Sequence, residues 1–385
     1  MIFVSRQRPH MLEILAIANY RSIRQLVIPL RPLIVVSGAN GAGKSNLYRA
    51  LRLLAETARG GVISAVAHEG GLGSTLWAGP DAPGTSRREG VSLRLGFTSD
   101  EFTYAIDLGF PEVGDSMFYL DPEIKRECIW AGRTQRPGAL LIDRRNALVR
   151  ARRNDGNWET LTSNLANFDS LFSQIADPVR APEVLRLRDE LRTWRFYDHL
   201  RTDMDAPVRR EQIGTRTVRL AHDGHDLAAA LQTIRENGDD LALREAISAA
   251  FPGTTLQIRA AGGRFTLELQ QEGLLRPLNA SELSDGTLRY LLWIAVLLTP
   301  RPPLLVVLNE PETSLHPDLV PALGQLIRTA SRRTQIWVTC HSPRLIASLR
   351  EDPLCSVIEL EKNFGATEVR ELGTLDQPAW KWPAR

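Results

Sequence analysis

The pattern of apolar and polar residues divides this 385-residue chain into three stretches of different character. In the first, short apolar runs at Leu12–Ala18, Gln25–Leu30 and Leu33–Ser37 predict strands, and the β-branched third run is typical of a buried parallel strand. Apolar residues then recur at helical spacing over Ser45–Arg59. Residues 60–90 are rich in Gly, Pro and Ser and predict an irregular loop.

The second stretch, from Val91 to Arg152, alternates apolar and polar residues, which predicts an antiparallel sheet with one polar face. Its expected strands are VSLRLGF, FTYAIDL, IKRECIWA, ALLI and NALVRAR. Helical spacing begins near Ser163, and the expected helices are Pro182–Tyr197, Asp226–Asn237 and Asp239–Ala250, followed by a hairpin of Thr254–Ala260 and Arg264–Gln270.

In the last stretch, apolar strands at Leu304–Leu308 and Gln335–Thr339 are each followed by a helix, which predicts a parallel sheet with crossover helices. No heptad pattern persists between 160 and 280, so we expect no long coiled coil. The longest apolar run, Tyr290–Thr299, is too short to span a membrane and predicts a buried helix.

Composition changes this picture only slightly. Hydrophobic residues make up 43% and charged residues 24%, as in an ordinary globular protein, and the net charge is +2. The first ten residues show no apolar stretch followed by a cleavage site, so we expect a cytoplasmic protein. Three scattered cysteines exclude a disulfide framework and a cysteine zinc ribbon. Residues 125–220 carry more basic than acidic side chains, a weak indication of a surface for polyanions.

The clearest motif runs from Gly38 to Ser45 and fits G-x-x-x-x-G-K-[ST] at every fixed position, between a predicted strand and a predicted helix. Glycines let the backbone N–H groups wrap around phosphates, and the helix adds its positive end. Lys44 is expected to reach the β- and γ-phosphates of ATP, and the Ser45 hydroxyl to bind Mg²⁺. The expected nucleotide contacts are Gly38, Ala39, Asn40, Gly41, Ala42, Gly43, Lys44, Ser45 and Asn46.

A second half-site follows the strand at Leu304–Leu308, whose pattern is that of a Walker B strand. Glu310 is expected to polarise the attacking water. The preceding position normally supplies an aspartate near Mg²⁺, but here it is Asn309, an amide without negative charge. We therefore expect weaker binding of the metal, and hydrolysis that is either slow or dependent on a partner.

Glu310-Pro311-Glu312-Thr313-Ser314-Leu315-His316-Pro317 and Thr339-Cys340-His341-Ser342-Pro343 together resemble the ABC ATPases of the SMC/RecF/OLD-like branch. The resemblance implies an α/β P-loop NTPase head with a mixed core sheet, an antiparallel β-rich lobe and a helical insertion. It further implies that Glu310 is the general base, Ser314–Pro317 the D-loop and His341 a contact to the γ-phosphate. Only 44 residues follow His341, so a nuclease domain of the OLD type is not expected there.

Three further segments fit the same resemblance. Leu283-Ser284-Asp285-Gly286-Thr287 is similar to the ABC signature L-S-G-G-Q and implies that Ser284, Asp285 and Gly286 contact nucleotide on an opposite protomer. By itself this segment is also an ordinary helix start capped by Ser284 or Asp285. Asn19-Tyr20-Arg21-Ser22-Ile23 resembles the N-F-R-S-F stretch that opens many such heads. Gln174 is either the glutamine-loop ligand of Mg²⁺ or a plain surface glutamine.

The expected ranges are an N-terminal lobe at 12–162, a helical insertion at 163–252 and a C-terminal lobe at 253–385. Three other clusters have structural and functional interpretations. His222–Asp226 indicates either a polar turn or a metal site. The aromatic residues Trp194, Phe196 and Tyr197 and the basic run Arg144–Arg153 indicate either ordinary packing and a solvated strand or contacts to nucleic acid.

Split motifs predict a homodimer that sandwiches ATP and couples nucleotide state to DNA or to an effector protein. The resemblance implies a role in DNA repair or anti-phage defence. Three alternatives remain from the sequence. The chain could be a nucleotide-gated clamp or scaffold with little hydrolysis, as Asn309 indicates. It could be the ATPase subunit of a transporter, or a DNA-binding module to which ATP is incidental.

Overall fold

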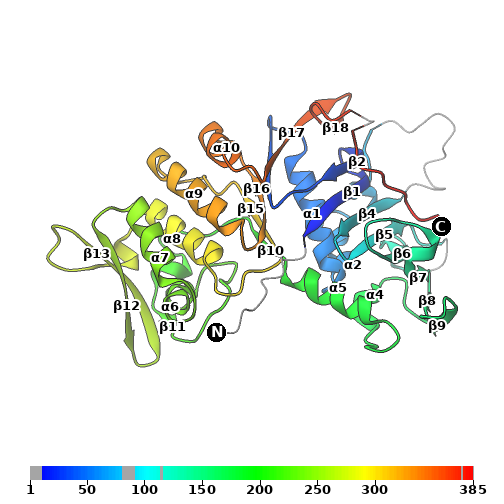
Figure 1. Ribbon diagram of the computed structural model, residues 1–385, viewed down its shortest axis with the longest axis horizontal. Coiled ribbons are helices and arrows are strands. Elements are labelled where there is room, and N and C mark those ends of the chain that lie inside the picture. Colours follow the sequence, from blue (N-terminus) through cyan, green and yellow to red (C-terminus); the bar gives the residue numbers. More distant parts are fainter. Residues whose placement is uncertain (1–10, 80–91, 113–115, 374–375, 385) are drawn as a thin grey trace. The chain divides into compact units, whose positions relative to one another are not determined.

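The computed structural model describes residues 11–79, 92–112, 116–373 and 376–384, and the chain forms two compact units (Figure 1). The unit that holds the phosphate loop, here the P-loop unit, contains the described residues of 10–31, 36–194 and 358–385. The other, here the Walker B unit, contains residues 32–35 and 195–357. These units divide the chain differently from the expected ranges 12–162, 163–252 and 253–385, because residues far apart in sequence return to the same sheet.

An antiparallel sheet of eight strands, in the order β2-β1-β4-β5-β6-β7-β8-β9, dominates the P-loop unit. Its strands are β1 (Leu12–Tyr20), β2 (Ile23–Pro29), β4 (Leu93–Ser99), β5 (Phe102–Gly109), β6 (Glu123–Ala131), β7 (Leu140–Arg145), β8 (Leu148–Arg152) and β9 (Trp158–Thr162). The antiparallel arrangement expected from the alternation is confirmed. Strand β9 was not expected, because Trp158–Thr162 is too short and polar to show a clear pattern.

The helices of the P-loop unit are α1 (Lys44–Thr57), α2 (Val62–His68), α3 (Leu72–Thr75), α4 (Leu171–Gln174) and α5 (Pro182–Thr193), with a 3₁₀ turn at Pro137–Ala139. Helices α2 and α3 correct the expected irregular loop at 60–90, of which residues 80–90 lie outside the described part. The glycines on either side concealed α2, which buries Val62 and Val66 one helical turn apart.

The expected helix Pro182–Tyr197 ends early, at Thr193. Arg195–Tyr197 instead forms strand β10, which belongs to the Walker B unit and pairs in parallel with β15 (Leu305–Asn309). A three-residue strand carries no detectable period, so tertiary pairing decided its conformation.

The Walker B unit contains a parallel arrangement in which β15 lies between β10 and β16 (Gln335–Thr339). The backbone N–H of Ile336 in β16 donates to the carbonyl of Pro32, at the start of β3 (Leu33–Gly38), over 2.9 Å. The expected parallel sheet with crossover helices is therefore present. Strands β3 and β17 (Cys355–Asn363) both begin in this unit and end in the P-loop unit.

The helices of the Walker B unit are α6 (Leu227–Asn237), α7 (Asp240–Ala250), α8 (Asp285–Leu297), α9 (Val320–Ala330) and α10 (Pro343–Arg350), with 3₁₀ turns at Pro207–Arg209, Ala280–Glu282 and Pro317–Leu319. A second sheet contains β11 (Gln212–Ile213), the hairpin β12 (Thr254–Ala261) and β13 (Arg264–Gln271), and β14 (Leu278–Asn279). Between residues 160 and 280, the longest helix is α5 with 12 residues, in agreement with the expected lack of a long coiled coil there.

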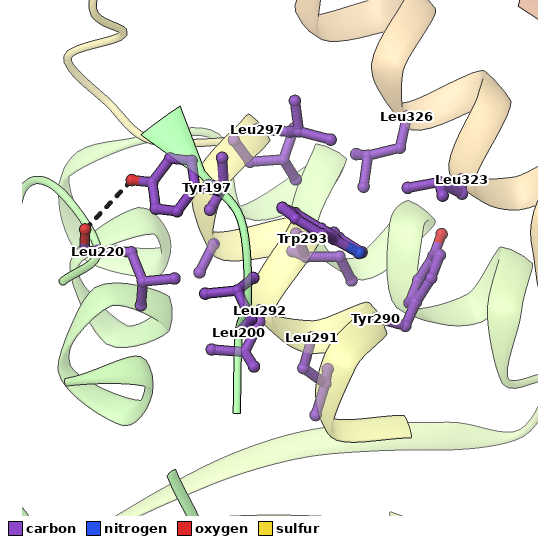
Figure 2. Packing of buried hydrophobic residues seen from close by; sticks show 14 of the residues in the cluster. Tyr197, Leu200, Leu220, Tyr290, Leu291, Leu292, Trp293, Leu297, Leu323 and Leu326 are labelled. Carbon is purple, nitrogen blue, oxygen red and sulfur yellow. Dashed lines mark hydrogen bonds between the residues drawn. The ribbon is translucent and has the colours of Figure 1, made fainter. Parts of the chain in front are cut away.

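Helix α8 lies at the centre of the hydrophobic core of the Walker B unit (Figure 2). Its residues 290–297 are all buried, which confirms the buried helix expected at Tyr290–Thr299. Figure 2 shows Trp293 between Leu292 and the α9 residues Leu323 and Leu326. On the other side of α8, the Tyr197 hydroxyl donates to the carbonyl of Leu220 over 3.1 Å.

A buried ion pair joins the large sheet of the P-loop unit to the segment before α4. The side chains of Arg144 and Glu127 are both 0% exposed and lie 3.0 Å apart. Glu127 also accepts from the hydroxyls of Tyr104 and Ser170, each over 2.6 Å, and from the backbone N–H of Leu171. Burial and the Glu127 charge raise the pKa of Tyr104 well above its ordinary value, so the phenol stays a donor.

We predict that Arg144→Met lowers the free energy of unfolding by about 3–5 kcal/mol, because it leaves the buried Glu127 charge without its cation. Urea denaturation followed by circular dichroism measures the loss. The control is Arg153→Met, which removes an arginine from an exposed ion pair with Glu159 and should leave the unfolding midpoint unchanged. Equal midpoints for both variants would contradict the structural role of the buried pair.

Candidate functional site

The phosphate loop begins where β3 ends and is shaped by glycines with positive φ. Gly38, Gly41 and Gly43 have φ of 144°, 79° and 110°. A Cβ at Gly41 would meet no atom within 4 Å, so the loop presents open backbone at this position. A Cβ at Gly43 would lie 2.1 Å from the Thr367 hydroxyl oxygen, so no side chain fits there. The loop therefore offers the backbone surface that a phosphate chain needs.

Helix α1 presents its positive end to this surface. Its first turn contains no acidic residue, and Gly43 caps it without a side-chain hydrogen bond. Lys44 is 6% exposed, and its Nζ donates to the carbonyls of Gly38 and Ala39 over 2.7 and 2.9 Å, which holds the ammonium over the loop. Ser45 is exposed in the first helical turn. These residues fit a triphosphate, with Ser45 available to Mg²⁺.

Hydrogen bonds among the side chains of Thr367, Ser22 and Asn46 support the phosphate loop. The Thr367 hydroxyl donates to the carbonyl of Ala42 over 2.9 Å and lies 2.7 Å from the hydroxyl of Ser22. The side-chain amide of Asn46 donates to the same Ser22 oxygen over 2.8 Å. Ser22 comes from the N-terminal Asn19–Ile23 segment, so that segment braces the phosphate loop. Thr367 lies in β18 (Ala366–Val369), and no feature of the sequence connected it with the loop.

Gln174 lies at the opposite end of α1 from the phosphate loop. A Cβ at Gly60, three residues beyond the end of α1, would lie 3.6 Å from the Cβ of neighbouring Ser173. The 14 residues of α1 span about 21 Å at 1.5 Å per residue. The Gln174 amide donates to Asp169 over 3.1 Å on the surface. We therefore do not retain Gln174 as a ligand of Mg²⁺, which corrects the expectation from chain order.

In the Walker B unit, the end of β15 brings Glu310 and His341 together. Asn309 pairs in register with Thr339 of β16, and the backbone N–H of Glu310 donates to the Thr339 carbonyl over 2.7 Å. Glu310 has a φ of 48°, an uncommon conformation for a non-glycine residue that turns the chain sharply out of the strand. Its Oε1 lies 3.0 Å from His341 Nε2. Both side chains are exposed, at 43% and 40%, and so accessible to water.

Glu312 fixes the backbone of the histidine. Its Oε1 accepts the backbone N–H groups of His341 and Ser342 over 2.7 and 3.0 Å. Ser342 in turn caps α10 by accepting from the N–H of Leu345. The other carboxylate oxygen of Glu312 is buried without a hydrogen-bond partner. Glu312 thus ties the turn after β15 to the segment after β16, a role that the sequence did not reveal.

The signature-like segment starts α8, and Ser284 is its N-cap. The Ser284 hydroxyl accepts from the backbone N–H of Thr287 over 3.2 Å, whereas Asp285 forms an ion pair with Arg209 at 2.5 Å. Arg209 also donates to the carbonyl of Leu283 over 2.8 Å. The arginine is 6% exposed and therefore acts as a fixed brace under the segment.

Helix α8 also contacts the segment that contains the expected D-loop of its own chain. A Cβ at Gly286 would lie 3.3 Å from the carbonyl oxygen of Ser314. Arg289 donates to the carbonyl of Thr313 over 3.1 Å, and the Trp293 indole donates to that of Pro311 over 2.9 Å. Desolvation by burial lowers the pKa of Arg289 from its ordinary value. The signature and the D-loop therefore form one block.

The remaining sequence candidates have structural roles. Asp226 accepts from the N–H of Ala221, and His225 pairs with Asp223, so His222–Asp226 is a polar turn; the described residues contain no cluster that could hold a metal. The three aromatic residues are 2–4% exposed and belong to the core: Trp194, Phe196 and Tyr197.

The basic run Arg144–Arg153 is largely bound within the protein. Arg144 is buried, Arg150 pairs with Asp143 at 3.0 Å, and Arg153 pairs with Glu159 at 2.7 Å. These contacts favour its interpretation as a strand surface.

A family profile described as "AAA domain, putative AbiEii toxin, Type IV TA system" matches residues 33–347, which include the phosphate loop, the signature-like segment, Glu310 and His341. The chain belongs to this AAA family. It has the P-loop NTPase fold of an SMC-like head, as the resemblance implied. No curated protein matches the sequence.

A solved structure of an SMC head shares the fold of this AAA domain. An Smc head bound to the C-winged helix domain of ScpA aligns with a TM-score of 0.51 and 15% identity over 93% of this chain and 96% of that chain. The SMC head domain from Thermotoga maritima aligns with a TM-score of 0.43 and 13% identity over 93% and 98% of the two chains. The first supports the fold. In the described residues of this AAA head, no helix is both long and apolar enough to cross a membrane.

We predict that Glu312→Ala lowers kcat for ATP by about 100-fold with little change in KM, because His341 loses the acceptor that positions its backbone. Glu312→Gln is the matched control, because its amide oxygen can still accept both N–H groups, and it should retain most activity. Steady-state ATPase assays, with circular dichroism to verify folding, measure both variants. A folded Glu312→Ala protein with the wild-type kcat would contradict this positioning role.

Proposed function

We propose that this chain is an ATP-hydrolysing head that works as a homodimer, with ATP sandwiched between the phosphate loop of one protomer and the signature segment of its partner. The observation that carries the proposal is the pairing of Glu310 with His341 at 3.0 Å beside the signature and D-loop block. The Ser284 hydroxyl and the first N–H groups of α8 offer a phosphate site that the same block orients.

Each residue then has a defined task. Lys44 neutralises the β- and γ-phosphates, and Ser45 and Asn309 would hold Mg²⁺, which supplies charge neutralisation at the phosphates. Glu310 takes the proton of the attacking water, and His341 orients Glu310 and contacts the γ-phosphate. Binding of two shared nucleotides closes the dimer, and hydrolysis reopens it.

The nucleotide state is transmitted to a protein effector or to DNA in the cytoplasm. Two comparisons support a protein partner: the family description names a putative toxin of a toxin–antitoxin system, and the similar Smc head is bound to a domain of ScpA. We place this activity in anti-phage defence or DNA repair, as the resemblance implied. The internal pairing of the Arg144–Arg153 run weakens the argument for DNA.

We predict that Glu310→Gln traps an ATP-bound dimer, because it removes the base but retains the shape of the side chain, and lowers turnover by about 10²–10⁴-fold. Light scattering in MgATP measures the dimer. The control Glu236→Gln changes an exposed carboxylate of α6 and should behave as wild type. A Glu310→Gln protein that stays monomeric in ATP would overturn the sandwich.

A second candidate function, a nucleotide-gated clamp with little hydrolysis, is favoured by Asn309. This residue ends β15 in register with Thr339, at the position where a carboxylate would bind Mg²⁺ through its water. The amide brings no negative charge, so Mg²⁺ is held less tightly and turnover is slow. ATP binding without turnover at any protein concentration would support the clamp. Specific activity that rises with protein concentration would support the ATPase dimer.

We predict that Asn309→Asp raises the apparent affinity for Mg²⁺ and raises, or at least maintains, ATP turnover, because the carboxylate restores a charge opposite the metal. A magnesium titration of ATPase activity measures both quantities. Asn237→Asp, on the exposed end of α6, is the matched control and should leave the titration unchanged. A large loss of turnover in Asn309→Asp would instead show that the amide has a role of its own.

A further inference from the structure

The hairpin of β17 and β18 runs beside the phosphate loop. The backbone N–H of Leu33, at the start of β3, donates to the carbonyl of Leu354, just before β17. At the other end, a Cβ at Gly38 would lie 2.3 Å from the carbonyl oxygen of Leu360. In both contacts, the later residue follows its partner by nearly the same number of positions along the chain. Strand β17 therefore runs parallel to β3, and Leu360 is level with the start of the phosphate loop.

From Leu360, β17 continues past the end of β3. Phe364, four residues further, stands up to about 13 Å beyond that level at 3.3 Å per strand residue. It lies on the carboxyl-end side of the parallel strands, where ligands bind in open α/β sheets. The tip of this hairpin is the turn between β17 and β18 in Figure 1.

Strand β18, the second strand of the hairpin, is hydrogen-bonded to the phosphate loop. The backbone N–H of Thr367 donates to the carbonyl of Ser22 over 2.7 Å, and its hydroxyl donates to Ala42. Thr367 is 1% exposed and fills the space that a side chain at Gly43 would need. A residue three positions before Thr367 is therefore held at a fixed place beside the loop.

Phe364 is an unusual residue for this turn. Asn363 pairs with Ala366, so Phe364 and Gly365 form a two-residue connection in which both have positive φ, 45° and 85°. Asn, Asp or Gly favours the first position of such a turn, and an aromatic residue there is strained. The Phe364 side chain is also 100% exposed. Strain and exposure both disfavour phenylalanine here unless a ligand covers the ring.

We propose that Phe364 stacks on the base of the nucleotide whose phosphates lie on the Gly38–Ser45 loop, an inference that rests on the proposed ATP site. The base is the flat, aromatic part of the ligand, and stacking on an aromatic side chain needs no hydrogen-bond partner. The hydrogen bond from Thr367 to Ala42 holds the base of this hairpin turn beside the phosphate loop. This hairpin thus supplies base affinity, while the loop supplies phosphate affinity.

Calorimetric titration of the full chain with the magnesium complex of a non-hydrolysable ATP analogue, and separately with magnesium tripolyphosphate, tests the proposal. We expect Phe364→Asn to weaken binding of the analogue by about 5- to 100-fold and to leave tripolyphosphate binding unchanged. Asparagine suits the positive φ, so this variant should fold at least as well as wild type. Phe364→Trp should bind the analogue as wild type does. Leu275→Ala, which truncates a fully exposed apolar residue of the Walker B unit, is the control and should change neither titration.

The outcomes separate the two proposals. Analogue binding by Phe364→Asn within twofold of wild type overturns base stacking and leaves the ATP site intact. An equal loss of analogue and tripolyphosphate binding also overturns it, because the hairpin would then only support the loop. Loss of the ATP-dependent dimer with unchanged analogue affinity overturns it in favour of a contact between protomers. A wild-type chain that binds neither ligand overturns the proposed function as well.

Discussion

The parallel register of β15 and β16 is the constraint on which the catalytic half of this protein depends. Because Asn309 is level with Thr339, the residues that follow both strands leave the sheet at the same edge. Glu310 is then anchored by the Thr339 carbonyl, and its side chain meets His341. A shift of one residue in this register would turn every side chain of the strand to the opposite face and separate the pair.

Every motif loop is held by a side chain that bonds to its backbone. Thr367 supports the phosphate loop, Glu312 supports the histidine segment, Arg209 supports the signature, and Trp293 supports the turn after β15. Such loops contain polar backbone groups that regular structure does not satisfy, and burying one without a partner costs about 1–3 kcal/mol. The bracing side chains remove this cost and fix the positions of the groups that meet the nucleotide.

The sequence predicted the motifs more successfully than it predicted the side chains that hold them in place. The phosphate loop, the strand before Glu310 and the helix after Leu283 were located because fixed residue types and a strand-then-helix order identify them. Gln174 was placed by order along the chain alone, and the structure puts its neighbour Ser173 beside Gly60, at the other end of α1. The order of residues along the chain shows which element contains a residue. It does not show which end of a neighbouring element that residue contacts.

By itself, the sequence determined the class of fold, the phosphate loop and the segments that carry Glu310, His341 and Ser284, because these depend on local residue types and periodicity. Only the tertiary structure decided that Tyr197 belongs to a strand, that Arg144 is buried with Glu127, and that Thr367 braces a loop more than three hundred residues earlier. Pairing of distant strands and burial of charge are set by the whole fold, and no local pattern of residues encodes them.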